Sequence, residues 1–87
     1  MNDVEIKVRQ LIVKFGRHSK LPNAIELSDT LLQDLGFDSL GIIQLTTAIE
    51  KTFEVSISDE ELLMQEEWAR TVGSLVIFLE DRLNMQE

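Results

Sequence analysis

The chain has 87 residues, of which 44% are hydrophobic and only 6% aromatic, so residues 1–87 suit one domain with a single modest, aliphatic core. Its net charge of −8 argues against nucleic-acid binding, which needs clustered Lys and Arg, and the absence of Cys excludes disulfides, thiolate metal sites and a thiol nucleophile. No hydrophobic run approaches the roughly 20 residues that cross a bilayer, and no leader resembling a signal peptide follows Met1, so we expect a cytoplasmic protein that binds no membrane.

The first predicted element is an amphipathic helix over residues 3–16. Asp3 is a suitable N-cap and Gly16 a suitable end, and the residues that share one helical face are Val4, Val8, Leu11, Ile12 and Phe15. Residues 17–38 then form a long connection, with a short turn expected after Ser28. The connection should pack over the bundle because it contains Ile25, Leu27, Leu31, Leu32 and Leu35.

Three further helices are predicted after this connection. The first begins at Asp38 or Ser39, ends near Phe53, and buries the face formed by Ile42, Leu45, Ile49 and Phe53. A short helix follows, because Ser58-Asp59-Glu60-Glu61 has the pattern of a capping box. The last begins near Thr71, with a hydrophobic stripe of Val72, Leu75, Val76, Leu79 and Leu83. The predicted fold class is all-α: a four-helix bundle with three longer helices, one short helix and a long first loop.

Residues suited to catalysis are scarce. The single His, His18, lies in a Gly-Arg-His-Ser-Lys stretch with no apparent partner. There is no phosphate-binding Gly-rich loop, and the acidic residues lack the ligand spacing of an EF-hand. We therefore expect no enzymatic activity, no catalytic residue and no metal site.

The most informative segment is Asp34-Leu35-Gly36-Phe37-Asp38-Ser39-Leu40. Taken alone, it is typical of a turn, an N-cap and a helix start. Together with further positions along the chain, this segment makes residues 31–83 resemble the acyl carrier protein family. These positions are Leu45, Glu50, Phe53, Ile57–Glu61 and Thr71-Val72. The resemblance implies a four-helix bundle whose Ser39 receives 4′-phosphopantetheine from coenzyme A, with Asp38 as the acidic neighbour that the modifying enzyme recognises. The arm would hold acyl intermediates as thioesters for fatty-acid, polyketide or related biosynthesis.

The residues agree with this assignment. A helix N-terminus favours an anionic substituent, and a chain without Cys needs a cofactor to supply a thiol. Opposite the buried face of the same helix, a predicted docking surface combines hydrophobic contacts with an acidic rim: Leu40, Ile43, Thr47, Glu50 and Glu54. The expected partners of this monomeric carrier are a phosphopantetheinyl transferase, an acyl- or aminoacyl-loading ligase, and synthase or transferase enzymes with basic docking patches.

Two positions depart from the usual pattern of fatty-acid carriers. Those carriers follow Asp-Ser-Leu with an acid and carry another three residues later, where this chain has Gly41 and Gln44. With Trp68 before Thr71-Val72, the pattern is similar to stand-alone aminoacyl carriers, including the D-alanyl carrier of teichoic acid modification. One alternative is therefore an aminoacyl or peptidyl carrier serving an adenylating ligase. Another is an acidic helical interaction module in which Ser39 stays unmodified.

Overall fold

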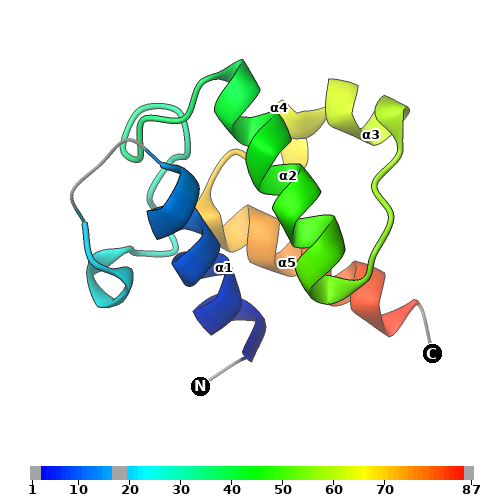
Figure 1. Cartoon of the computed structure of the whole chain (residues 1–87), viewed down its shortest axis with the longest axis horizontal. Coiled ribbons are helices and arrows are strands. Elements are labelled where there is room, and N and C mark those ends of the chain that lie inside the picture. The colour runs from blue at the N-terminus through cyan, green and yellow to red at the C-terminus, as the bar shows by residue number, and fades with distance from the viewer. Residues whose placement is uncertain (1–2, 17–19, 86–87) are drawn as a thin grey trace.

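The computed structural model describes residues 3–16 and 20–85, so His18 lies outside the described residues. The elements in chain order are α1 (Asp3–Phe15), the 3-10 turn η1 (Pro22–Ala24), α2 (Ser39–Phe53), α3 (Asp59–Leu63), α4 (Gln65–Trp68) and α5 (Val72–Asn84). The predicted all-α class is confirmed: the described parts contain no strand, only an isolated bridge between Thr30 and Thr71. α1 packs against both α2 and α5, and the long connection lies at one side of the bundle (Figure 1).

The predicted short helix is divided in two. α3 begins with the expected capping box, in which the Ser58 side chain accepts from the Glu61 N–H and the Glu61 side chain accepts from the Ser58 N–H. Met64 then leaves helical geometry, with φ −103° and ψ 20°, and its N–H bonds back to Glu61 and Leu62. The chain resumes as α4, so the four-helix prediction becomes three long helices and two short ones among the described residues.

The hydrophobic periodicity of the long helices places the core correctly. On α1, Val8 and Ile12 are buried, and the helix ends as expected at Gly16, whose N–H donates to the Ile12 carbonyl at 2.8 Å. Asp3 is the first residue of α1, although it was predicted to precede it as the N-cap. The core residues on α2 and α5 match the predicted stripes: Ile42, Leu45, Ile49, Val72, Leu75, Val76 and Leu79. Phe53 and Leu83 are partly buried against them.

The long connection is tied to the beginning of α5 by backbone hydrogen bonds. The Leu31 N–H donates to the Arg70 carbonyl at 3.1 Å, and the Val72 N–H donates to the Asp29 carbonyl at 3.0 Å. The Asp29 carboxylate is buried and accepts from Lys20 Nζ at 2.8 Å and from the Glu26 N–H at 3.0 Å. These bonds join a segment without long helices to the rest of the bundle.

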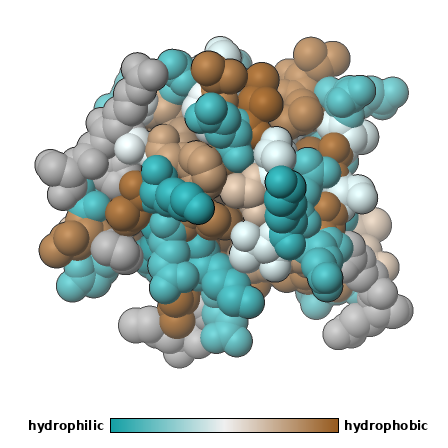
Figure 2. Space-filling view, viewed as in Figure 1, coloured by the Kyte–Doolittle hydropathy of each residue, from teal (hydrophilic) through white to brown (hydrophobic). Residues whose placement is uncertain are grey.

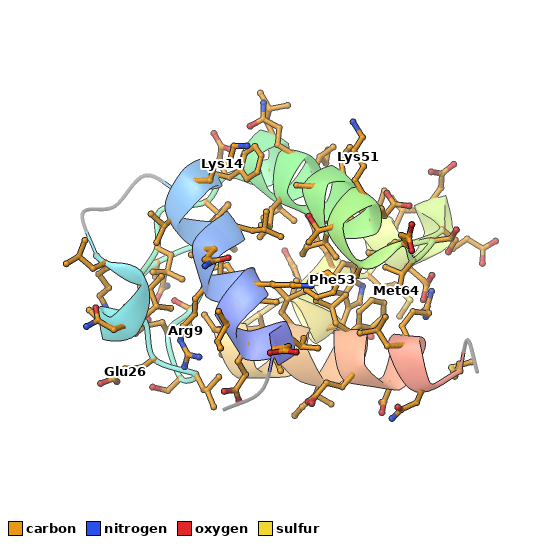
Figure 3. The ribbon with its side chains drawn as sticks, turned by 60° about the horizontal axis from the view of Figure 1, so that its bottom comes forward. Arg9, Lys14, Glu26, Lys51, Phe53 and Met64 are labelled. Carbon is orange, nitrogen blue, oxygen red and sulfur yellow. The ribbon has the colours of Figure 1, made fainter. Side chains whose placement is uncertain are left out.

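The expected packing of this connection is only partly correct. Ile25, Leu31 and Leu35 are buried, but Leu27 and Leu32 are exposed. The expected turn after Ser28 is present, because the Asp34 and Leu35 N–H groups donate to the Thr30 carbonyl at 3.2 and 3.1 Å. The chain also turns at η1 and over residues 26–29, where the Asp29 N–H donates to the Glu26 carbonyl at 3.0 Å. From α1, Arg9 reaches this segment and donates from Nε to the Ile25 carbonyl at 3.0 Å, near Glu26 (Figure 3).

A cluster of side chains fastens α3 and α4 to α5. The Trp68 ring stacks on Phe78 with centroids 4.3 Å apart, and Trp68 Nε1 donates to the Glu61 carbonyl at 2.7 Å. Arg82 forms an ion pair with Glu61 and donates to the Ser56 carbonyl at 2.6 Å. The hydrogen bonds from Arg82 and from the Ser58 N–H lower the pKa of Glu61 to about 2.

Candidate functional site

Residues 36–41 determine how α2 begins. Gly36 has a φ of 70°, a left-handed conformation that residues with a Cβ rarely adopt. Phe37 is buried, and its N–H donates to the Leu31 carbonyl at 2.9 Å, which anchors the turn in the core. Asp38 is the N-cap, and its Oδ1 accepts from the Gly41 N–H at 2.7 Å, so of the two predicted starting residues it is Ser39 that begins the helix. Ser39 therefore becomes the first residue of a 15-residue helix.

Gly41 fits a narrow space beside this cap. A Cβ at this position would lie 3.1 Å from Asp38 Oδ1 and 3.3 Å from Phe37 Cδ1. Both distances are shorter than ordinary van der Waals contact, so a larger residue would press against the capping carboxylate. A residue with a Cβ at position 41 would therefore require the Asp38 carboxylate or the Phe37 ring to shift by a few tenths of an ångström.

Ser39 is exposed and lies at the edge of a cavity of about 370 Å³. The cavity is lined by Thr30, Leu32, Gln33, Ser39, Ile42, Gln65, Glu66, Ala69 and Arg70. At the N-terminus of α2, backbone N–H groups and the helix dipole favour an anionic group on the serine oxygen. An exposed hydroxyl, a helix N-terminus and an adjacent cavity fit a phosphate-linked arm.

The hydrophobic part of the predicted docking surface is exposed. Leu40 is 62% exposed and Ile43 48%, and hydrophobic surface lies over the beginning of α2 along the upper edge of Figure 2. Thr47 is also exposed, and its hydroxyl donates to the Ile43 carbonyl at 3.0 Å. These side chains lie on the face of α2 that turns away from Ile42, Leu45 and Ile49.

The two acidic residues of the predicted rim differ from each other. Glu54 is exposed at the C-cap of α2 with a φ of 56°. Glu50 is partly buried, and its Oε2 accepts from the Ile57 N–H at 3.0 Å. Glu50 therefore fixes the segment between α2 and α3, a role that helical periodicity alone did not reveal.

Comparisons with known proteins agree with this geometry. The family model for the phosphopantetheine attachment site matches residues 6–79. An acyl carrier protein of Amoebophilus asiaticus is 35% identical over 83 residues, covering 95% of this chain and 96% of that protein. The chain belongs to the acyl carrier protein family. A second acyl carrier protein, from Phenylobacterium zucineum, is 31% identical and covers 95% of this chain and 98% of its own length.

A relative with a more specific name is also similar. The anthracycline acyl carrier protein DpsG of Streptomyces peucetius is 29% identical over 77 residues, covering 88% of this chain and 87% of its own. Membership of this family makes the chain an acyl carrier that holds a covalently bound 4′-phosphopantetheine. In the described part of this acyl carrier, no helix is long and hydrophobic enough to span a membrane.

Sequence reasoning missed the cavity beside Ser39. Its walls come from the connection, α2 and α4, and the contributing residues have no common spacing in the sequence. Gln65 and Arg70 were not singled out, because α4 was not distinguished from the preceding short helix. Across residues 3–16 and 20–85, no group of three His, Cys, Asp or Glu side chains could hold a metal ion.

Proposed function

We propose that Ser39 is the residue that carries the 4′-phosphopantetheine arm, and that this carrier presents acyl intermediates to enzymes of fatty-acid, polyketide or related biosynthesis. The observation that supports this assignment is the exposed hydroxyl at the first position of α2, directly after its Asp38 cap. The dipole of this long helix stabilises a phosphodiester at that position. When bound, the arm supplies the thiol that forms a thioester with the acyl group, which a chain without Cys cannot supply.

The residues around Ser39 have separable tasks in this proposal. Asp38 binds the Gly41 N–H at 2.7 Å and so holds the first turn in place beneath Ser39. Leu40, Ile43 and Thr47 offer exposed contacts on the same helix to the phosphopantetheinyl transferase and the downstream enzymes. Glu54 contributes negative charge at the other end of the helix, where it attracts basic docking patches.

The modification itself provides the first test. A broad-specificity phosphopantetheinyl transferase with coenzyme A should add one arm to the purified chain, as measured by intact mass. Ser39→Ala should abolish the addition, whereas Ser28→Ala, at an exposed loop serine, should leave it unchanged. Addition to the Ser39→Ala chain would show that another serine is used. Failure of the unaltered chain to accept an arm would favour an unmodified interaction module.

The docking surface can be tested through the rate at which a loading enzyme acts on the carrier. Exposed charges act mainly on encounter and are screened by salt, so Glu54→Lys should slow loading and flatten its salt dependence. Ile43→Ala should instead accelerate dissociation with little change in salt dependence, because it removes hydrophobic contact area.

Glu26→Lys is a matched control for charge, since Glu26 is exposed on the first loop, away from α2 (Figure 3). Its loading rate should stay close to that of the unaltered carrier at both low and high salt. Equal slowing by Glu26→Lys and Glu54→Lys would mean that total charge matters and that α2 is not the docking helix.

A further inference from the structure

Three lysines form a cationic flank on α1 and α2. Lys7 and Lys14 are seven residues apart and therefore share one face of α1, and Figure 3 shows Lys51 of α2 on the same side of the ribbon as Lys14. All three side chains are exposed, and no carboxylate pairs with any of them in the part of the chain that the structure describes. Asp3, one turn before Lys7, is the acid that shares this face of α1. A chain with a net charge of −8 thus has one side that is locally positive.

Aromatic rings hold two of these lysines beside the junction of the two helices. Lys7 Nζ lies 5.9 Å from the centroid of the Phe53 ring, at the end of α2. Lys14 Nζ lies 5.6 Å from the centroid of the Phe15 ring, at the end of α1. A contact of this kind stabilises an exposed ammonium group modestly and leaves its charge in place. The flank therefore keeps three positive charges that can face another molecule.

A hollow of about 120 Å³ lies between the end of α1 and the first turns of α2. Its hydrophobic lining comes from Phe15, Phe37 and Leu40, and its polar lining from Gln44 and the capping carboxylate of Asp38. Since an apolar cavity of about 150 Å³ can hold one benzene molecule, this hollow suits one aliphatic side chain. Leu40 also belongs to the predicted docking surface, so the hollow extends that surface towards α1.

The two departures from the usual fatty-acid carrier pattern meet at this hollow, because Gly41 and Gln44 both line it. An acid at position 44 would add negative charge next to Phe15, the ring that Lys14 covers. With Gln44 instead, the side of the molecule that bears Lys14 and Lys51 favours an anionic partner. A long polyanion or an anionic membrane would also meet the acidic remainder of the surface, and neither has an aliphatic side chain for the hollow. A short acidic protein segment satisfies both features.

We propose that the cationic flank and the hollow bind an acidic segment of the enzyme that loads this carrier. Carboxylates of the segment face Lys14 and Lys51, and one aliphatic side chain enters the hollow. This inference rests on the proposed docking of partners to α2. The enzyme then meets cations on one side of α2 and Glu54 at the end of that helix, so its docking patch carries charges of both signs. Such an arrangement determines the orientation in which the enzyme approaches Ser39.

The rate of loading, by the enzyme isolated through its activity on this carrier, tests the charges at low and high salt. Lys14→Gln with Lys51→Gln makes the flank variant, and Asn23→Asp with Ser28→Asp makes a control with the same change in net charge on the first connection, where both residues are exposed. The flank variant should load about 2- to 30-fold more slowly than the control at low salt, and the difference should shrink at high salt. An enzyme that presents basic residues alone would instead load the flank variant faster. Equal or faster loading of the flank variant would overturn the inference.

Position 44 separates the contribution of the hollow from that of charge. Gln44→Phe leaves the net charge unchanged and covers the hollow with a ring, so it should slow loading to the same extent at both salt concentrations. Gln44→Glu places an acid beside the flank and should slow loading mainly at low salt. Gln44 is exposed, so thermal melts of both variants should match that of the unaltered carrier. Unchanged loading of Gln44→Phe would overturn the assignment of the hollow.

A zero-length cross-link tests the contact in the unaltered carrier. A water-soluble carbodiimide joins an amine to a carboxylate as an amide, so Lys14 or Lys51 should be found coupled to an acidic residue of the loading enzyme. Cross-links that join only carboxylates of the carrier to lysines of the enzyme would overturn the inference. Binding of the unaltered carrier, but not of the flank variant, to phosphatidylglycerol vesicles would assign the flank to a lipid surface and overturn it as well.

Failure of this inference can be told apart from failure of the docking proposal. Slower loading of Glu54→Lys and Ile43→Ala, with the flank variant equal to its control, would overturn the acidic segment and leave docking to α2 in place. Loading that none of these changes affects would overturn both.

Discussion

Replacement of Ile49 by Ala tests the assignment of the two faces of α2. Ile49 is 0% exposed and lies in the hydrophobic core. Truncation removes buried methyl and methylene groups and leaves a cavity, which costs about 2–5 kcal/mol. At roughly 0.05–0.15 kcal/mol per residue, a chain of this length has a total stability of about 4–13 kcal/mol. A loss of about 3 kcal/mol, at roughly 4–8 °C per kcal/mol, would lower the melting temperature by about 12–24 °C.

Ile43→Ala is the matched control, because it makes the same chemical change on the opposite face of the same helix. Ile43 is 48% exposed, so its truncation should cost about 1 kcal/mol or less. Urea and thermal unfolding followed by circular dichroism would measure both losses. A similar loss for the two variants would place Ile43 in the core, and the proposed docking surface would then be wrong.

The remaining predictions concern two capping side chains. The pKa of Glu61 in the folded chain is about 2, below its ordinary 4.5, so its stabilising effect is complete above about pH 4.5 and is lost as the pH falls through 2. Glu61→Gln should be less stable than the unaltered chain at pH 7. Urea unfolding over a pH series should show that the difference in free energy of unfolding between the two chains shrinks from about pH 4.5 downwards. A constant difference down to pH 2 would contradict the lowered pKa of Glu61. Asp38→Ala should lower the free energy of unfolding by about 1 kcal/mol and accelerate hydrogen exchange at the Gly41 N–H, and an unchanged exchange rate would mean that the cap contributes little.

The long helices and the position of Ser39 could be predicted because their signals are local. Hydrophobic residues repeat with the period of a helix, and Asp38, Ser58 and Thr71 lie where N-caps are expected and act as such. The division between α3 and α4 at Met64 had no comparable signal, since neither Gly nor Pro marks it.

The path of the first connection and the cavity depended on contacts between distant residues. The Leu31 N–H bonds to the carbonyl of Arg70, and Lys20 pairs with Asp29, and neither partner could be identified from spacing along the chain. The same limit applies to Glu50, whose bond to the Ile57 N–H depends on how the chain turns after α2. Helical periodicity tells which side of a helix is buried, but it does not tell which loop returns to cover a polar side chain.

The stacking of Trp68 on Phe78 gives this carrier an intrinsic optical probe. Trp68 is the single Trp and the chain has no Tyr, so ultraviolet-excited emission comes almost entirely from one indole ring. That ring is held by Phe78 of α5 and by the Glu61 carbonyl of α3, so its emission wavelength and quenching depend on how α3 and α4 rest on α5. Changes in this region when a group is attached at Ser39, or when a partner enzyme binds, can therefore be followed by fluorescence in unlabelled protein.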